Sequence, residues 1–195
     1  MQSWGYRSRF DYRDTALEPT RSGVIGLVCA AMGIARGEDI SRFDKIRMGV
    51  RVDKEGRPER DYHTALDVIK ADGSGPDTVV SHRDYLADAS FTVALQCQDK
   101  SLLEEIAAAL QCPKWFLFLG RKAFPLTVPP VLDPQEPVKP GAIEDHLIAG
   151  HSHKRVVLED SAGERTQHDW PLCFGERRFK PRAITTCYEH EGDPP

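Results

Sequence analysis

The sequence contains no apolar run that approaches the ~20 residues of a membrane-spanning helix, and its first residues are polar and aromatic. We therefore expect neither a membrane segment nor a signal peptide, and a cytoplasmic location. The five cysteines are odd in number and form no Cys-x-x-Cys pair, which excludes a zinc ribbon and a disulfide framework. No Walker-type Gly-Lys-Ser/Thr ending occurs either. The composition gives no reason to expect a metal or another cofactor.

The sequence has the composition of an ordinary folded domain, with 195 residues, of which 40% are hydrophobic and 29% are charged. The net charge of −4 argues mildly against a general nucleic-acid coat. The charge is unevenly distributed, because residues 1–60 hold 12 Lys and Arg against nine Asp and Glu. A basic face contributed by the N-terminal part is compatible with nucleic-acid binding.

The hydrophobic pattern predicts an α+β fold in one domain over residues 1–195. Alternation predicts a half-buried strand at 46–52, a turn at 55–58 and a second hairpin arm at 61–69. Residues 72–76 are typical of a flexible tip, and residues 125–140 hold six of the 14 prolines and predict an irregular connection. The remaining expected elements are helices at 22–34, 40–44 and after a capping box formed by Ser101 and Glu104, and strands at 78–83, 90–96, 115–119, 156–158 and 182–188.

Residues 19–27 predict a loop that turns into a helix, with Thr20 or Ser22 as the N-cap. The exposed backbone N–H groups of a helix start favour an anion, and Arg21 adds a bidentate donor for phosphate. Gly23 leaves room for a close approach. The alternative is a tightly packed helix whose glycines lie against a sheet.

Three further segments combine cations with aromatic or polar groups. Residues 61–64 place Tyr62, His63 and Thr64 together, which suits acid–base chemistry on a ribose hydroxyl, base stacking or an ordinary hairpin arm. Residues 120–122 place Arg121 and Lys122 after a glycine, which suits a phosphate backbone or a solvated loop. Residues 81–85 include Arg83, which either contacts RNA or pairs with a neighbouring carboxylate.

Two other polar patterns are weaker. His151 and His153 lie two residues apart without a third ligand nearby, which is poor evidence for a metal site. The basic run at 177–182 suits RNA, a partner protein or a solvated strand end.

Six motifs in order resemble the CasD-type subunits of the type I-E CRISPR Cascade complex. They are residues 1–5, 19–27 with 33–34, 60–64, 83–86, 88–91 and 119–122. The resemblance covers residues 1–130 best and includes 174–182. Members of that family begin with an apolar strand before the Gln-Ser-Trp-Gly motif, and we expect that strand to be missing from this sequence.

The resemblance implies a modified ferredoxin-like, RNA-recognition-motif fold with a thumb β-hairpin at about 50–77. It implies a non-catalytic subunit that holds the 5′ handle of crRNA and caps the backbone filament. The implied partners are crRNA, the repeating backbone subunit and the large PAM-recognising subunit, with target DNA contacted indirectly. The expected RNA-binding residues are Gln2, Ser3, Trp4, Arg21, Ser22, Gly23, Tyr62, His63, Thr64, Arg83, Arg121 and Lys122.

Two rival functions remain open from the sequence. One is a metal-independent endoribonuclease that processes CRISPR repeat RNA, in which Tyr62 or His63 activates the 2′-hydroxyl and Lys122 stabilises the developing charge. The other is a protein-interaction domain without RNA contact. Salt-dependent RNA binding separates this last function from the first two.

Overall fold

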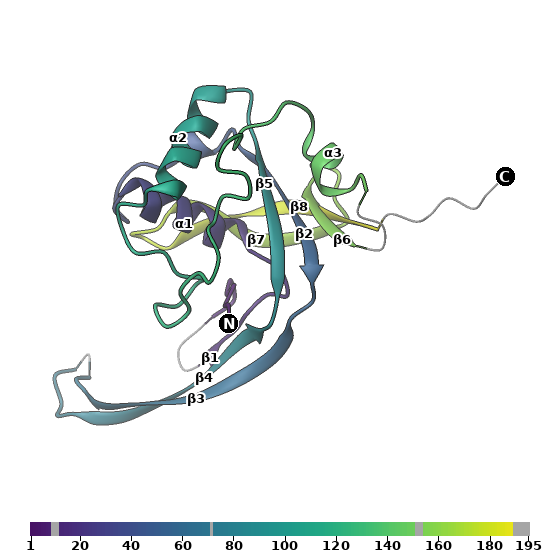
Figure 1. Ribbon diagram of the computed structural model, residues 1–195. Coiled ribbons are helices and arrows are strands. Elements are labelled where there is room, and N and C mark those ends of the chain that lie inside the picture. The colour runs from purple at the N-terminus through teal and green to yellow at the C-terminus, as the bar shows by residue number, and fades with distance from the viewer. Residues whose placement is uncertain (9–11, 71, 151–153, 189–195) are drawn as a thin grey trace.

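The computed structural model describes residues 1–8, 12–70, 72–150 and 154–188 and contains two sheets (Figure 1). The larger sheet has the strand order β5-β2-β6-β8-β7, and the smaller has the order β1-β4-β3. The strands are β1 (Tyr12–Arg13), β2 (Arg47–Lys54), β3 (Arg57–Val68), β4 (Asp77–Ala87), β5 (Ser90–Gln96), β6 (Arg155–Glu159), β7 (Arg165–Cys173) and β8 (Arg178–Tyr188). The helices are α1 (Arg21–Met32), α2 (Lys100–Gln111) and α3 (Ile143–Leu147), with a 3₁₀ turn at Ser41–Phe43. None of these helices is long and apolar enough to cross a membrane.

A long bent ribbon links the two sheets. The inner half pairs β2 with β5, and the outer half pairs β3 with β4. The strand β2 of the larger sheet therefore leads into β3 of the smaller sheet, and β4 leads back into β5. Gly56 lies at the interruption, where an added Cβ would come 2.7 Å from the Cβ of Ala89. Opposite it, Asp88 has a positive φ of 59°. These two positions bend the ribbon, and the outer half projects from the body as a hairpin (Figure 1).

This ribbon corrects the expected hairpin. Residues 61–69 were expected to fold back on 46–52 through a turn at 55–58, which is wrong, because β3 pairs with β4. The hairpin covers residues 57–87 rather than about 50–77, and its tip lies between Val68 and Asp77. The turn residues at 55–58 bend a continuing strand, whereas residues 72–76 do lie in the tip, as expected.

Both faces of β2 are covered, although its alternation predicts only one buried face. Met48 and Val50 pack with Val24 of α1. On the other face, an added Cβ at Gly49 would lie 2.6 Å from Leu147 of α3. The short helix α3 and the strand β7 were not expected from the sequence. Of these two, α3 covers the second face of β2, whereas β7 lies at the far edge of the same sheet.

Two further local expectations are wrong. Helix α2 begins at Lys100 with Asp99 as its N-cap, whose carboxylate accepts from the backbone N–H of Leu102, so Ser101 and Glu104 form no capping box. Residues 115–119 do not form a strand. They belong to an irregular connection in which only Phe118 bridges to Pro125.

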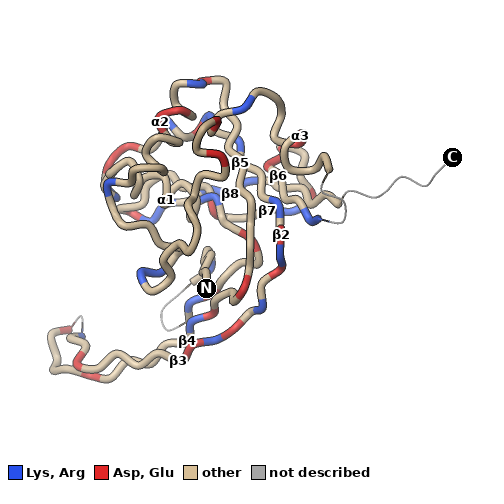
Figure 2. Tube along the Cα trace, in the orientation of Figure 1, with Lys and Arg blue, Asp and Glu red and all other residues tan. Residues whose placement is uncertain are grey.

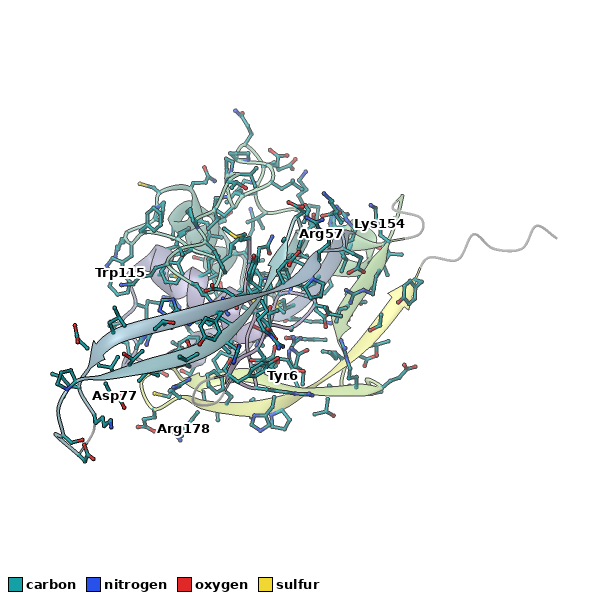
Figure 3. All side chains as sticks on the ribbon, turned by 90° about the horizontal axis from the view of Figure 1, so that it is seen from below. Tyr6, Arg57, Asp77, Trp115, Lys154 and Arg178 are labelled. Atoms are coloured by element: carbon teal, nitrogen blue, oxygen red, sulfur yellow. The ribbon has the colours of Figure 1, made fainter. Side chains whose placement is uncertain are left out.

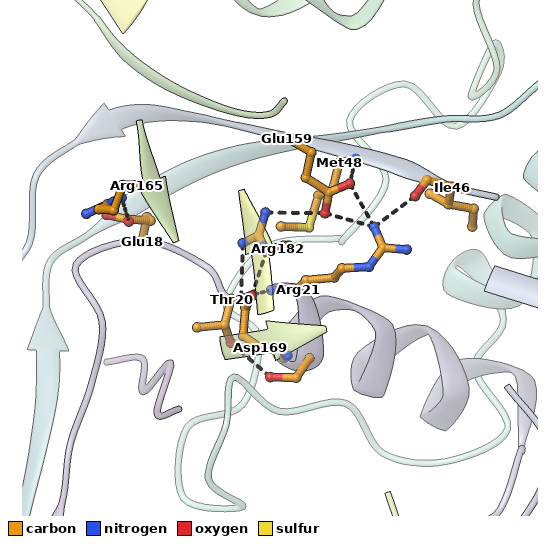
Figure 4. Close-up of polar contacts among 11 residues, drawn as sticks. Glu18, Thr20, Arg21, Ile46, Met48, Glu159, Arg165, Asp169 and Arg182 are labelled. Atoms are coloured by element: carbon orange, nitrogen blue, oxygen red, sulfur yellow. Dashed lines mark hydrogen bonds and ion pairs between the residues drawn. The ribbon is translucent and has the colours of Figure 1, made fainter. Parts of the chain in front are cut away.

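A buried network of four charged side chains joins α1 to the larger sheet (Figure 4). Arg21 is 1% exposed and donates to the Glu159 carboxylate at 2.9 Å. Arg182 donates to Glu159 at 3.2 Å and to Asp169 at 2.6 Å. Two positive and two negative side chains are therefore neutralised together, which is the condition for burying them.

The N-terminus of α1 binds an anionic group, as expected, but this group is the Asp169 carboxylate of the protein itself. The Asp169 carboxylate accepts from the backbone N–H of Arg21 at 2.7 Å. Thr20 is the N-cap and accepts from the N–H of Gly23 at 3.2 Å. A carboxylate and a hydroxyl of the protein itself therefore accept from two of the unpaired N–H groups at the helix start, as those donors and the helix dipole favour.

We predict that Asp169→Ala lowers the free energy of unfolding by about 3–5 kcal/mol, because Glu159 then faces both Arg21 and Arg182 and the buried network keeps one uncompensated positive charge. Urea denaturation measures the change. Arg178→Ala is the matched control, since this exposed arginine pairs with exposed Glu176 and should shift stability by less than about 1 kcal/mol. Equal effects of the two substitutions would contradict the role of the network.

Candidate nucleic-acid interface

The register of the hairpin divides its side chains between two faces. Asp61 lies opposite Arg83, and Tyr62 lies opposite His82. Cross-strand partners share a face and neighbours along a strand alternate, so Tyr62 and His63 point to opposite sides of the ribbon. The parallel pairing of β1 with β4 adds Arg13 beside Arg83.

One face carries three arginines, Arg13, Arg83 and Arg121, which we call the cationic cluster. Burial lowers the pKa of the Arg121 guanidinium, and the positive charges of Arg83 and Arg13 lower it further. The carboxylates of Asp61 and Asp84 oppose this shift. Like charges gathered in this way favour an added anion. Figure 2 shows Lys and Arg gathered where the hairpin meets the body, whereas the outer hairpin carries few of them.

The loop that carries Arg121 is fixed to the base of the hairpin. Arg121 donates through Nη2 to the backbone carbonyl of Asp84 at 2.6 Å. Gly120, with φ of +85°, lies so close to the Ser3 carbonyl that a Cβ would meet it at 1.8 Å. Phe124 packs against Tyr85 in a tilted arrangement with ring centroids 5.6 Å apart. The glycine is therefore required for the close approach that places Arg121 beside β4.

The N-terminal arm lies between this loop and β4. Gln2 exchanges two backbone hydrogen bonds with Leu86, at 2.9 and 2.8 Å. Ser3 donates its backbone N–H to Leu119 at 3.0 Å, and its hydroxyl contacts the carbonyl of Asp84 at 3.4 Å. The expected residues Gln2, Ser3 and Arg121 are therefore brought together at one place.

The structure contradicts part of the expected RNA-binding wall. Trp4 is 4% exposed, and its ring fills the space at Gly23, where a Cβ would lie 2.7 Å away. Ser3 is buried, Ser22 is half-buried against Thr20, and Arg21 is sealed in the ion network. These side chains are buried or bonded within the protein, so they do not form an exposed phosphate-binding site. The alternative of a tightly packed helix is confirmed in part, because its glycines face the rings of Trp4 and Phe174 rather than a sheet.

Three of the expected RNA-binding residues are exposed, two on the hairpin and one on the 120–122 loop. Tyr62 is exposed and meets His82 edge-on at 5.5 Å between ring centroids. Thr64 is exposed, and His63 is partly buried on the face of the cationic cluster. Lys122 is exposed at the tip of its loop.

A second polar group on the far face was missed by the sequence reasoning. Arg60 donates to the Asp84 carboxylate at 2.7 Å and to the Tyr12 hydroxyl at 3.1 Å, and Tyr12 donates to the same carboxylate. The hydrogen bond from Arg60 is the main cause that lowers the pKa of Asp84. Asp84 therefore holds Arg121 and Ser3 through its carbonyl, and Arg60 and Tyr12 through its carboxylate.

Within the described residues, no group of three metal-ligating side chains is close enough to hold a metal ion. His151 and His153 lie outside the described residues. In the basic run at 177–182, Arg182 is buried in the ion network and Arg178 pairs with Glu176.

Comparison with known proteins identifies the family of this chain. Residues 1–185 match the family described as CRISPR-associated protein (Cas_Cas5), and the chain belongs to that family. The chain is similar to the CRISPR system Cascade subunit CasD of Escherichia coli (strain K12), at 34% identity over 188 residues that cover 82% of this chain and 83% of that protein. The resemblance to CasD-type subunits is thereby confirmed.

Two solved structures are similar over nearly the whole chain. A chain of a CRISPR RNA-guided surveillance complex matches with a TM-score of 0.78 and 33% identity, over 96% of this chain and 85% of that one. A crystal structure of a Cas protein matches with a TM-score of 0.72 and 37% identity, over 96% and 89% of the two chains. These matches support a mixed α and β fold of Cas proteins.

We predict that Arg60→Ala raises the pKa of Asp84 toward the ordinary value of about 3.9. The folded pKa is depressed, so the pairing stabilises the fold above the unfolded pKa and is lost as the pH falls through the folded pKa. A carboxyl carbon NMR titration of Asp84 measures the shift. Arg57→Ala, which removes the exposed partner of Asp88, is the control and should leave the Asp84 midpoint unchanged.

Proposed function

We propose that this chain is a non-catalytic RNA-binding subunit of a type I-E Cascade complex, and that it holds the 5′ handle of crRNA. The observation that carries the proposal is the cationic cluster, because three arginines from β1, β4 and the 120–122 loop face one side of the hairpin base. Lys122 extends this surface. Cations of this kind hold the backbone of single-stranded RNA. The exposed rings of Tyr62 and His82 lie on the other face of the hairpin and offer a separate surface for base stacking.

The fold supports the same proposal in its finer form, a modified ferredoxin-like or RNA-recognition-motif domain with the β3–β4 hairpin as the thumb. A two-stranded hairpin that projects from a body is marginally stable by itself in water. Its outer half nevertheless exposes Leu66 by 70% and Ile69 by 79%. Exposed apolar groups of this kind mark a partner surface. We assign this end to the repeating backbone subunit, so that the chain caps the filament. The large PAM-recognising subunit is the second protein partner, and target DNA is reached through the complex.

The geometry does not favour the endoribonuclease alternative. Tyr62 and His63 lie on opposite faces of β3, so only one of the two proposed bases, His63, can act beside the cationic cluster. His63 alone shares a face with Arg83. A single-turnover assay on repeat RNA tests the remaining possibility, and we expect no cleavage. Cleavage that His63→Ala abolishes would replace the present proposal with the enzymatic one.

The first test is to purify the intact complex from its host and map the 5′ ends of the bound RNA. We expect small RNAs that share one repeat-derived 5′ end. The absence of RNA, or RNA unrelated to repeats, would refute the handle-binding function and leave a protein-interaction domain.

We predict that the double substitution Arg83→Ala with Lys122→Ala weakens binding of the handle RNA by about tenfold or more. Each lost phosphate contact also reduces the salt dependence, so the slope of log affinity against log salt should fall by roughly 1.4 for two contacts on a single strand. Fluorescence anisotropy at several salt concentrations measures both. Arg36→Ala, an exposed cation in the turn after α1, is the control. An unchanged salt slope would mean that the RNA phosphates do not contact Arg83 and Lys122.

A further inference from the structure

The strand β1 has only two residues, and their side chains point to opposite faces of the hairpin. In the parallel register of β1 with β4, Tyr12 pairs with His82 and Arg13 pairs with Arg83. Arg13 therefore lies on the face of the cationic cluster, whereas Tyr12 lies on the far face. Because the two residues are neighbours in the chain, a contact that holds Tyr12 on one face also fixes the backbone that carries Arg13 on the other.

The Tyr12 hydroxyl joins β1 to both strands of the hairpin. It donates to the Asp84 carboxylate of β4 and accepts from the Arg60 guanidinium of β3 at 3.1 Å. The Arg60 Cζ also lies 5.3 Å from the centre of the Tyr12 ring, within the range in which a cation is attracted to an aromatic face. The hydrogen bond to Asp84 is the main cause that raises the pKa of Tyr12, so the hydroxyl stays protonated and donates at neutral pH. Among the described residues, every side-chain hydrogen bond between β1 and the hairpin involves this hydroxyl.

The chain that follows β1 is fixed to the N-terminal arm rather than to the hairpin. The Asp14 carboxylate accepts from the Ser8 hydroxyl at 2.6 Å, and the Thr15 hydroxyl accepts from the backbone N–H of Trp4 at 2.9 Å. These bonds fix one end of β1, but they do not set its position on β4. A strand of two residues is shorter than an ordinary strand and forms few ladder hydrogen bonds, so its pairing with β4 needs the additional attachment that Tyr12 supplies.

All three arginines of the cationic cluster are placed relative to Asp84. The Asp84 carbonyl accepts from Arg121, its carboxylate accepts from Tyr12 beside Arg13, and Arg83 directly precedes it on β4. Figure 3 shows the hairpin in front of the body with Arg57 marking its base, and the strand register places Asp84 toward that end. One residue of β4 therefore brings together cations from three separate segments.

We propose that Tyr12 is a positioning residue for RNA binding, because its hydroxyl fixes β1 on the far face of the hairpin and so holds Arg13 where an RNA phosphate meets it. An arginine on a fixed backbone loses less conformational freedom when it binds, which strengthens the contact. Tyr12 itself lies on the opposite face and does not contact that phosphate. This inference rests on the proposed function, since it explains how one member of the cationic cluster is placed.

The test replaces Tyr12 with phenylalanine, which keeps the ring and removes only the hydroxyl. Because Tyr12 is 41% exposed, the substitution leaves the core unchanged. The probe is a fluorescent RNA with the 5′ sequence recovered from the purified complex, and anisotropy of the full chain at several salt concentrations measures its binding. We expect Tyr12→Phe to weaken binding about threefold to fivefold and to lower the slope of log affinity against log salt by as much as roughly 0.7, the value of one phosphate contact on a single strand.

Tyr188→Phe is the matched control, because it removes an exposed hydroxyl at the end of β8 in the larger sheet. It should change neither the affinity nor the salt slope.

A double-mutant cycle separates positioning from direct contact. If Tyr12 acts through Arg13, Tyr12→Phe weakens binding in the wild-type chain and has no further effect in a chain that already carries Arg13→Ala. Additive effects of the two substitutions would overturn the inference. Unchanged binding by Tyr12→Phe would also overturn it, and weak binding by Tyr12→Ala in that case would mean that the ring stacks on RNA.

Hydrogen exchange tests the attachment of β1 without RNA. In Tyr12→Phe we expect the backbone amides of β1 and of the facing residues of β4 to exchange faster than in the wild-type chain, because the local opening needs less free energy. Exchange at the wild-type rate would overturn the inference. If the wild-type chain binds the handle RNA no better than an unrelated RNA, the proposed function fails and the inference falls with it. That failure is distinguishable, because it appears before any substitution is made.

Discussion

The neutralisation of Arg21 within the protein is the constraint on which the rest of the structure depends. A buried guanidinium costs several kcal/mol of lost hydration, and this cost is offset only by well-placed partners. Glu159 accepts from Arg21, and the backbone carbonyls of Ile46 and Phe43 accept from its Nη1 and Nη2 at 2.8 and 2.9 Å, whereas its buried Nε has no partner among the described residues. Because Arg182 and Asp169 complete the balance of charge, the start of α1 is tied to β2, β6, β7 and β8 at once (Figure 4).

The position of the candidate interface follows from this attachment. With α1 fixed, Gly23 presents a flat place to the Trp4 ring, and the N-terminal arm is held beside β4. The arm in turn supports the loop of Gly120, and that loop places Arg121 against Asp84. The candidate interface lies on the hairpin and on a loop, but α1 supports it through the N-terminal arm.

The local sequence predicted much of the fold, because the strand alternation at 46–52 and 90–96, the helix that follows Thr20 and the irregular 125–140 segment depend on nearest neighbours. It failed where distant residues decide. The glycine and proline at 56–58 are compatible with a turn or with a bend in a continuing strand. Only the pairing of β3 with β4 shows that they form the bend. Asp99 rather than Ser101 caps α2, because Asp99 also holds Lys45 in an ion pair at 2.6 Å.

The sequence by itself determined that this chain is an α+β protein of a recognisable CRISPR-associated family, since the order of six short motifs carries that information. It also placed Arg83, Arg121 and Lys122 among the candidate RNA contacts. Only the tertiary structure decided which cations face solvent. Arg21 and Arg121 are alike as residues beside a helix or loop start, but Glu159, 138 positions away from Arg21, removes one of them from the surface. Burial and charge pairing over such separations are properties of the folded chain, and no local pattern encodes them.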